Sequence, residues 1–465
     1  MNRHTDFAPS RASKPTRRNM SEDLKPYRYA PIALSSESTV VAEFLPECLG
    51  VREAVYQSEA ELEKTFIRQL QAQAYAYLPI TSEAELIANL RHQLEKLNQM
   101  TFSDAEWERF FSTCIAGAND GIIEKTARIQ EDHVQVLKRD DGTTRNIYLI
   151  DKANIHNNAL QVINQYEVPV GANRDSPARA NRYDVTILVN GLPMVHVELK
   201  RRGVDIREAF NQINRYQRDS FWAGSGLFEY VQLFVISNGT LTKYYSNTVR
   251  DGHLKEQSAR RGKGGSKNKT SNSFAFTSWW ADARNQPITE LIDFTKTFFA
   301  KHSLLNVLTK YCVFDVDRKL LVMRPYQIVA AERILQRIAT STNHRQLGTV
   351  AAGGYIWHTT GSGKTLTSFK AAQLARNLPD IDKVLFVVDR KDLDYQTMRE
   401  YERFEKGAAN SNTSTAVLQR QLEDPNARII ITTIQKLSRF VVGNKQHPVY
   451  DAHVVVIFDE CHRSQ

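Results

Sequence analysis

The sequence predicts an α/β protein built from two successive α/β blocks, and three observations lead to this fold class. Between Ser58 and Leu78, apolar residues recur at helical spacing, and a second such pattern follows around Leu86 to Leu97. Short strand-like runs mixed with turn residues then continue to about residue 245. Beyond Arg324, strands that are apolar on both faces alternate with helices, which is typical of a buried parallel sheet.

The bulk composition is that of an ordinary folded protein with a surplus of basic residues. The chain has 465 residues, of which 42% are hydrophobic and 24% are charged. This composition predicts two or three compact units and excludes a disordered or fibrous chain. A net charge of +9 favours a polyanionic partner. The four cysteines have no paired spacing, which fits the reducing cytoplasm, and no apolar run approaches the roughly 18 residues that span a bilayer.

Two segments rich in basic and small polar residues divide the chain. Residues 1–22 carry Arg and Lys among Ser, Pro and Thr, which predicts a flexible basic tail. Residues 255–273 have no hydrophobic period and predict a flexible basic loop. We therefore expect one domain at 23–254 and another at 274–465. The basic loop either contacts phosphates of a polyanion or is a solvated linker, and both readings stay open.

The strongest chemical signal is a glycine-rich loop that enters a helix. The segment His358-Thr-Thr-Gly-Ser-Gly-Lys-Thr follows the strand-like residues 355–357 and precedes a helical stretch. Glycines let backbone N–H groups approach phosphate oxygens, a lysine reaches the β- and γ-phosphates, and a hydroxyl binds Mg²⁺. A plain Gly-Ser turn would not require all of these residues. The residues predicted to bind ATP and its Mg²⁺ here are Gly361, Ser362, Gly363, Lys364 and Thr365, although His358 stands where the motif has its first glycine.

A pair of carboxylates at the end of a later strand complements this loop. The strand-like run from Val454 to Phe458 leads directly into Asp459 and Glu460. In this arrangement Asp459 would bind the Mg²⁺ that bridges the nucleotide phosphates, and Glu460 would polarise the attacking water. Such a pair is by itself usually a solvated turn, but together with the loop it predicts ATP hydrolysis.

The first block contains two consecutive strands whose polar residues share one face. Residues 183–189 and 194–200 flank an Asn-Gly turn, which predicts a β-hairpin. Alternation of side chains places on one face Asp184, Thr186, His196, Glu198 and Lys200. We expect a three-residue loop with a bulge at Gly191, because that register sets Asp184 opposite Glu198.

Two carboxylates on neighbouring strands, with a lysine close to one of them, suit metal-assisted hydrolysis of a phosphodiester. Asp184 and Glu198 would bind Mg²⁺, and Lys200 would reach the attacking water. An exposed hairpin face can show the same residue types without any function. His196 shares this face and is expected to be a packing or hydrogen-bonding group rather than a ligand.

The hairpin resembles the active site of the PD-(D/E)xK nucleases. Asp184 is followed after thirteen residues by Glu-x-Lys, although Tyr183 stands in the place of the proline. Gln212 and Tyr216, which lie four residues apart on one helical face, resemble the supporting pair of the RecB-like branch. That pair implies a helix beside the metal site that contacts DNA or positions the lysine. The resemblance also implies an extra acidic ligand from an early helix, for which the candidates are Glu61 and Glu63.

The second block resembles the superfamily 2 helicases. Asp459-Glu-Cys-His is similar to their motif II, and Gln327 in Arg-Pro-Tyr-Gln is similar to the residue that reads adenine. Two further segments, 389–392 and 432–435, resemble motifs that follow a nucleic-acid backbone. These motifs imply the DNA-binding residues Arg390, Lys391, Thr433 and Gln435. Ordinary loop capping is an alternative for both segments.

The combination of both blocks resembles the restriction-and-motor (R) subunit of type I restriction-modification enzymes. The similarity runs from about Ser58 to the end and includes WHTTGSGKT and SWWADARNQP. It implies a PD-(D/E)xK nuclease-like domain followed by the first of two RecA-like parallel-sheet helicase domains. It also implies Mg²⁺ and ATP as cofactors, and modification and specificity subunits as partners. The activity implied is that of a type I site-specific deoxyribonuclease, an ATP-dependent endonuclease that translocates along double-stranded DNA.

Three further expectations follow from the sequence. Because the chain ends at Gln465, soon after motif II, we expect an N-terminal fragment without the second motor domain that binds ATP weakly and does not translocate. One rival function is a helicase or translocase whose nuclease-like domain only binds DNA. Another is a nuclease whose ATP site merely senses nucleotide.

Overall fold

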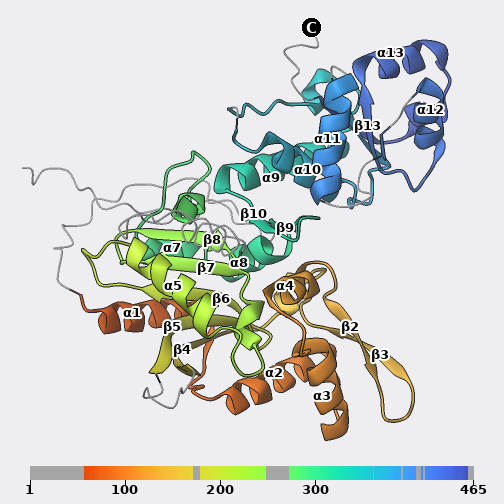
Figure 1. Ribbon diagram of the computed structural model, residues 1–465. Coiled ribbons are helices and arrows are strands. Elements are labelled where there is room, and N and C mark those ends of the chain that lie inside the picture. Colours follow the sequence, from red (N-terminus) through yellow and green to blue (C-terminus); the bar gives the residue numbers. More distant parts are fainter. Residues whose placement is uncertain are drawn as a thin grey trace, which may run out of the picture.

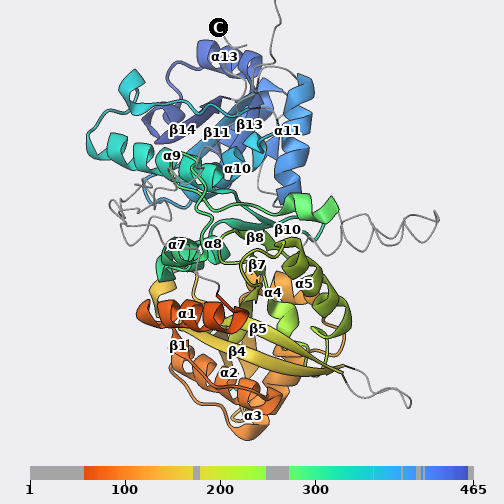
Figure 2. The same cartoon turned by 90° about the vertical axis from the view of Figure 1, so that its left-hand side faces the viewer.

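The computed structural model describes residues 57–170, 179–247, 272–359, 361–388, 391–404, 410–411 and 414–458. Figures 1 and 2 show two bodies, one built around a large sheet and one that contains α9 to α13. The predicted α/β class is therefore confirmed. The predicted basic tail, residues 1–22, and loop residues 255–271 lie outside the described residues.

The first body contains seven α-helices, counted over the described residues, and ten strands. The helices are α1 (Glu59–Ala72), α2 (Glu83–Asn98), α3 (Asp104–Phe110), α4 (Ile122–Gln130), α5 (Arg207–Asp219), α7 (Leu291–Thr297) and α8 (Lys301–Thr309). The strands are β1 (Ala76–Tyr77), β2 (Val134–Lys138), β3 (Thr144–Tyr148), β4 (Leu160–Val170), β5 (Arg179–Val189), β6 (Leu192–Leu199), β7 (Leu233–Ser237), β8 (Thr242–Ser246), β9 (Cys312–Phe314) and β10 (Leu320–Val322). Capping boxes fix the first turns of α1, α2 and α3, because the serine at the N-cap of each helix and the glutamate three residues later satisfy each other's backbone N–H groups.

The large sheet is mixed, with the strand order β1-β4-β5-β6-β7-β8. β5 pairs antiparallel with β6, and β6 pairs parallel with β7, so β6 is hydrogen-bonded on both sides. All eight residues of β6 are buried. The β2–β3 hairpin projects beside α3, away from this sheet (Figure 1). The polar residues of β6 therefore lie inside the body and not on its surface.

One hydrophobic core holds the first body together, and it extends beyond the predicted domain boundary. Trp280 packs edge-on against Phe298, and both rings contact Tyr244 of β8. The same core continues through α7 and α8 to Met323 and the start of α9. The boundary at 274 stays a prediction, but residues 274–323 pack with the large sheet. Figure 2 shows α8 and β10 on the side of this sheet that faces the second body.

The second body is a layered α/β unit. Its helices are α9 (Pro325–Asn343), α10 (Lys364–Ala375), α11 (Lys391–Phe404), α12 (Thr415–Glu423) and α13 (Ile434–Gly443). Its strands are β11 (Lys383–Val388), β12 (Asn410–Ser411), β13 (Ile429–Thr433) and β14 (Val454–Phe458), all parallel, in the order β12-β13-β11-β14. Alternate residues of β11 pack against α10 and α11 on one face and α12 and α13 on the other. The predicted parallel sheet with strands apolar on both faces is confirmed for β11 and β13.

Two details of the predicted second block are wrong. Residues 355–357 do not form a strand, and the side chains of Tyr355 and Trp357 are 86% and 87% exposed. Strand β14 lies at the edge of the sheet and is only partly buried, with Phe458 half exposed. A β-prone sequence becomes a strand only when a neighbouring strand pairs with its backbone. Residues 355–357 have no such partner among the described residues.

Candidate functional sites

The hairpin of β5 and β6 has the expected register near its base but a different turn. Asn190 and Gly191 both have positive φ and form a strict two-residue turn, so the bulge predicted at the glycine is wrong. The extra residue is absorbed farther along, where the register shifts between Ile187 and Leu188. Beyond this shift Val185 pairs with Val197, so the next position sets Asp184 opposite Glu198, as expected.

A tertiary contact explains why the turn is tight. A Cβ atom on Gly191 would lie 2.6 Å from the Cα atom of Leu90 in α2. The side chain of Asn190 is bound to the backbone of Leu149 and Ala159. The turn is thus held against α2 and the neighbouring loop, which leaves the bulge to form within the strands.

The three predicted nuclease residues lie together at the base of the hairpin. A carboxylate oxygen of Asp184 accepts a hydrogen bond from the backbone N–H of Leu199 at 2.8 Å. Lys200 Nζ donates to Glu198 Oε1 at 3.0 Å and to the Leu199 carbonyl at 2.9 Å. Glu198 is fully buried and Lys200 is 9% exposed. Two carboxylates and one ammonium group therefore share a small, nearly dry space.

Burial governs the electrostatics of this cluster. It raises the pKa of both Asp184 and Glu198, and the charge of Glu198 raises that of Asp184 further. Burial alone would lower the pKa of Lys200, but Glu198 and Asp184 together hold that pKa above its usual value. Lys200 is therefore charged and neutralises one of the two negative charges, so the second carboxylate charge costs free energy until a further cation neutralises it.

A divalent cation fits these residues. Glu198 Oε2 is buried without a hydrogen-bond partner, and a cation would satisfy this acceptor. Carboxylate oxygens are the ligands that Mg²⁺ prefers. Among the described residues, no group of three or more His, Cys, Asp and Glu side chains is arranged around one point. Asp184 and Glu198 would thus hold the ion with few protein ligands, which is usual for Mg²⁺.

Helix α5 places the predicted supporting pair over the polar face of the hairpin. Gln212 Nε2 donates to the hydroxyl of Tyr216, which donates to the Arg182 carbonyl of β5 at 2.7 Å. The Tyr216 ring packs 6.0 Å from the ring of His196. Burial raises the pKa of Tyr216 to about 12, and the charges of Glu198 and Asp184 add to this rise. The pair therefore lies next to the carboxylates.

Glu61 and Glu63, the candidates for an extra acidic metal ligand, each have hydrogen-bond partners outside the cluster of Asp184, Glu198 and Lys200. Glu61 is used in the cap of α1, where it accepts the Ser58 N–H, and Glu63 accepts the side-chain amides of Asn164 and Gln165. Glu59 instead accepts the Arg201 N–H, and its charge contributes to the raised pKa values of Glu198 and Lys200. Sequence reasoning missed Glu59, because only the contact of the start of α1 with the end of β6 brings it near.

Helix α9 holds the predicted phosphate loop. Gly361 and Gly363 both have positive φ, and α10 begins at Lys364, directly after the loop. Its first turn includes Thr365. Tyr326 OH and Gln327 Nε2 donate to the Ser362 carbonyl at 2.7 and 3.0 Å. The first backbone N–H groups of α10 have no partner within the helix, and a helix start of this kind can bind an anion.

The predicted adenine reader has a structural task in this arrangement. Gln327 Oε1 accepts the Arg324 N–H and so caps α9, while its Nε2 binds the loop. A Cβ atom on Gly363 would lie 2.5 Å from that nitrogen. The His358 ring packs edge-on against Tyr326. The side-chain amide of Gln327 therefore connects the phosphate loop to the start of α9.

The structure describes only some of the residues predicted to bind DNA or to complete the ATP site. Asp459, Glu460 and Arg390 lie outside the described residues, and Lys391 is described only as the first residue of α11. Thr433 is buried and accepts the Lys436 N–H, which caps α13. Gln435 is exposed in the first turn of that helix. Thr433 thus caps a helix, as the alternative of ordinary loop capping expects, and its contact with DNA stays a prediction.

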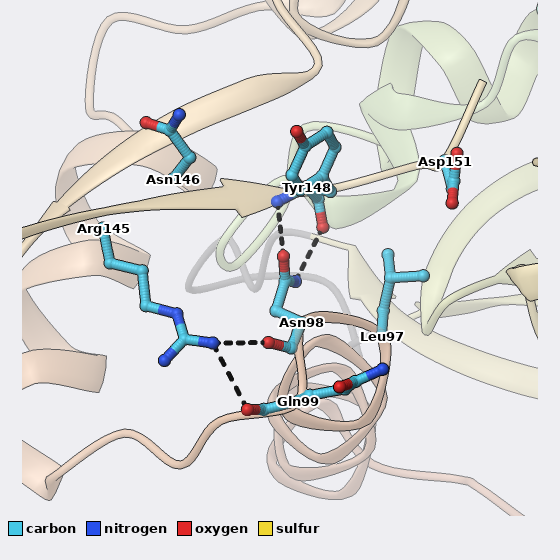
Figure 3. A pocket seen from close by; sticks show the side chains of 7 residues that line it. All are labelled: Leu97, Asn98, Gln99, Arg145, Asn146, Tyr148 and Asp151. Atoms are coloured by element: carbon cyan, nitrogen blue, oxygen red, sulfur yellow. Dashed lines mark hydrogen bonds between the residues drawn. The ribbon is translucent and has the colours of Figure 1, made fainter. Parts of the chain in front are cut away.

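A separate pocket of about 260 Å³ lies between α2 and β3 (Figure 3). Arg145 donates to the carbonyls of Asn98 and Gln99, and the Asn98 side chain binds the backbone of Tyr148. These groups cap the C-terminal end of α2. The pocket contains none of the predicted site residues, and its main polar groups already have partners.

Each of the two bodies matches a known protein family in sequence. Residues 56–253 match a family described as type I restriction enzyme R protein N terminus, and residues 326–465 match the SWI2/SNF2 ATPase family. Among the described residues, no helix is both long and apolar enough to cross a membrane.

Curated relatives extend over most of the chain. It is 41% identical over 421 residues to the type I restriction enzyme SsaAORF53P endonuclease subunit of Staphylococcus saprophyticus, a match that covers 88% of this chain and 40% of that protein. It is 47% identical over 318 residues to the EcoprrI endonuclease subunit of Escherichia coli, covering 68% of this chain and 93% of that protein. The chain thus spans about two fifths of the length of the staphylococcal relatives that it matches.

Proposed function

Because this chain belongs to the family of type I restriction enzyme endonuclease subunits, we propose that it works within such a subunit, which cleaves both strands of DNA with Mg²⁺, coupled to ATP-driven translocation. It would act as a type I site-specific deoxyribonuclease. Its relatives carry endonuclease names, and its second half is similar to SWI2/SNF2 ATPases. The observation that carries the proposal is the cluster of the buried Glu198 and Lys200 with the partly buried Asp184.

The cluster supports cleavage because two carboxylates placed side by side in a largely buried site destabilise the fold. A carboxylate pair with raised pKa values, of which Glu198 is fully and Asp184 partly buried, weakens the fold, so a protein retains such a pair where a function uses it. An exposed hairpin face would show ordinary solvated acids instead. The complete burial of Glu198 beside the Asp184 carboxylate therefore favours a metal-binding role.

Each residue has a distinct task in this mechanism. Asp184 and Glu198 would hold the Mg²⁺, which would supply Lewis-acid polarisation of the scissile phosphate. Charged Lys200 is a hydrogen-bond donor next to that position, so it orients the attacking water and stabilises negative charge on the phosphate. The Tyr216 ring excludes solvent from one side, and Gln212 fixes its hydroxyl.

We assign the first body to the PD-(D/E)xK nuclease-like fold and the second to the RecA-like helicase fold. In the second body Gly361 to Thr365 would bind the ATP phosphates, with Thr365 and Asp459 on the Mg²⁺ and Glu460 on the water. The left-handed glycines and the start of α10 support this assignment. Arg390, Lys391, Thr433 and Gln435 would follow the DNA backbone.

The proposed partners are double-stranded DNA and the modification and specificity subunits of the same system. The net charge of +9 is consistent with a DNA partner. Recognition of a DNA sequence would then reside in the specificity subunit, and this chain would supply cutting and motor chemistry.

A plasmid-cleavage assay on the subunit assembled with its partners tests the proposal. Asp184→Asn and Glu198→Gln are expected to abolish cleavage while ATP hydrolysis continues. Glu208→Gln, which changes an exposed acid on α5, is the matched control and should cleave normally. Normal cleavage by Asp184→Asn would contradict the nuclease assignment and favour a translocase whose nuclease-like domain only binds DNA.

A further inference from the structure

We infer that His196 is a positioning residue for the nuclease site, which orients Glu198 toward Mg²⁺ through its Nε2–H group while Thr186 fixes its tautomer. This inference rests on the proposed nuclease function and adds two residues to its machinery. His196 would not touch the metal or the DNA.

The surroundings of His196 leave its polar atoms few options. The ring is fully buried on β6, two residues before Glu198 and therefore on the same face of the strand. Aromatic rings enclose it, with centroid distances of 5.5 Å to Tyr183, 5.7 Å to Phe221 and 6.5 Å to Phe234. A polar ring in such an apolar cage is costly unless both nitrogens have hydrogen-bond partners.

Each nitrogen faces one polar atom. His196 Nδ1 lies 3.2 Å from the hydroxyl of Thr186, its cross-strand partner. His196 Nε2 lies 3.4 Å from Glu198 Oε2. His196 Nε2 and Glu198 Oε2 are both buried, and neither has a hydrogen-bond partner among the described residues. A small shift would join a donor and an acceptor that otherwise stay unsatisfied.

The chemistry of the two neighbours decides where the ring proton lies. A metal-bound Glu198 is ionised and can only accept, so Nε2 must carry the proton in order to bind it. A neutral imidazole then has an unprotonated Nδ1, which accepts the hydroxyl proton of Thr186. The order of donation is Thr186 to His196 and His196 to Glu198, and it selects one tautomer.

The consequence would be a carboxylate held at both oxygens. Lys200 donates to Glu198 Oε1, and His196 Nε2, which lies 3.4 Å from Oε2, would donate to that second oxygen. With one lone pair of each oxygen engaged, the plane of the carboxylate is fixed and the other lone pairs are available to the metal. Outer partners of this kind orient metal ligands in many proteins, and their loss typically costs about 10–100-fold in metal affinity.

Titration of the 465-residue chain with Mn²⁺, followed by electron paramagnetic resonance, tests the inference without an activity assay. His196→Leu removes the donor, and Thr186→Val removes the hydroxyl at nearly constant shape. Both should weaken Mn²⁺ binding by about 10–100-fold. His196→Gln, whose amide can donate from a similar place, and Thr186→Ser should bind Mn²⁺ much as the wild type does. Melting temperatures measured in parallel show whether each variant is folded.

The outcomes separate the inference from the proposed function. If the wild type binds Mn²⁺ and Glu198→Gln does not, but Thr186→Val binds like the wild type, the positioning role is overturned while the metal site stands. If the wild type has no Glu198-dependent Mn²⁺ site, the proposed function fails and the inference falls with it.

Histidine-labelled NMR supplies an independent check. The resonances of His196 are identified by their loss in His196→Gln. A proton on Nε2 in the wild type supports the inference, and a proton on Nδ1 overturns it. Thr186→Val should shift the tautomer balance even where the melting temperature is unchanged, which a purely packing role would not do.

Discussion

The two candidate sites are positioned in different ways. Glu198 lies on β6, which pairs with a strand on each side, and Lys200 follows directly with its backbone N–H bound to Ser237. The phosphate loop is held instead by the side chains of Tyr326 and Gln327, and the described residues 353–359 that lead into it form no strand. Substitutions in the first site should therefore change chemistry while the backbone stays fixed. Substitutions around the second should change loop shape as well.

The largest expected effect separates the two sites. In the assembled enzyme, Glu198→Gln should lower DNA cleavage by more than about 100-fold, since loss of even an outer partner of a metal ligand costs about 10–100-fold. Its ATP hydrolysis should stay normal, as followed by phosphate release. Lys364→Ala should abolish both activities, because translocation needs ATP. If Lys364→Ala cleaves DNA as fast as the wild type, the two sites are not coupled.

A second effect concerns the turn that fixes the nuclease hairpin. Gly191→Ala should destabilise the protein by about 1–3 kcal/mol, because Gly191 has a φ of 84° and its Cβ would meet the backbone of α2. Gly348→Ala is the matched control, since Gly348 has a φ of 76° but open space around it. Equal losses in denaturant unfolding would show that the contact with Leu90 is unimportant.

A third effect concerns the link between α9 and the phosphate loop. Gln327→Ala removes the α9 cap and the hydrogen bond to Ser362, each worth about 1 kcal/mol. We expect weaker binding of a fluorescent ATP analogue and unchanged Mn²⁺ binding at the hairpin. Gln336→Ala, on the exposed face of the same helix, should change neither. A loss of nucleotide affinity in both variants would contradict a specific role for Gln327.

The smallest expected effect is a gain in stability with a defined pH dependence. Burial and the Glu198 charge raise the pKa of Asp184 from 3.8 to about 7. A carboxyl whose pKa is raised by folding stabilises the protein while it is protonated, and that stability is lost as the pH rises through the raised value. Without metal, Asp184→Asn should therefore melt a few degrees above the wild type at about pH 8 and much closer to it at about pH 5. A larger gain at the lower pH would show that Asp184 is not destabilised by burial.

Sequence reasoning performed well where the relevant pattern is local. Alternation along two strands placed Asp184, Glu198 and Lys200 together, and four-residue spacing placed Gln212 and Tyr216 on one face of α5. A shared face depends on backbone periodicity alone, whereas the position of Asp184 opposite Glu198 also needs the register shift between Ile187 and Leu188. The helix that follows the phosphate loop was likewise evident from its residue pattern.

The features that sequence reasoning missed all depend on contacts between distant segments. The bulge lies within β5 and β6 because Gly191 packs on α2, and Glu59 reaches the site only because α1 starts beside the end of β6. Residues 274–323 join the first core through rings such as Trp280, although they follow a basic loop in the sequence. Residues 355–357 have strand propensity but no strand beside them.

The most direct test of a metal-dependent cutting site is a crystal structure of the chain soaked with Mn²⁺ and measured at the manganese absorption edge. The account predicts an anomalous peak between Asp184 and Glu198, about 2.1 Å from an oxygen of each carboxylate. The same peak should be absent from crystals of Asp184→Ala. No peak in the wild type, or one that persists at this place in Asp184→Ala, would contradict the assignment of the hairpin as the nuclease centre.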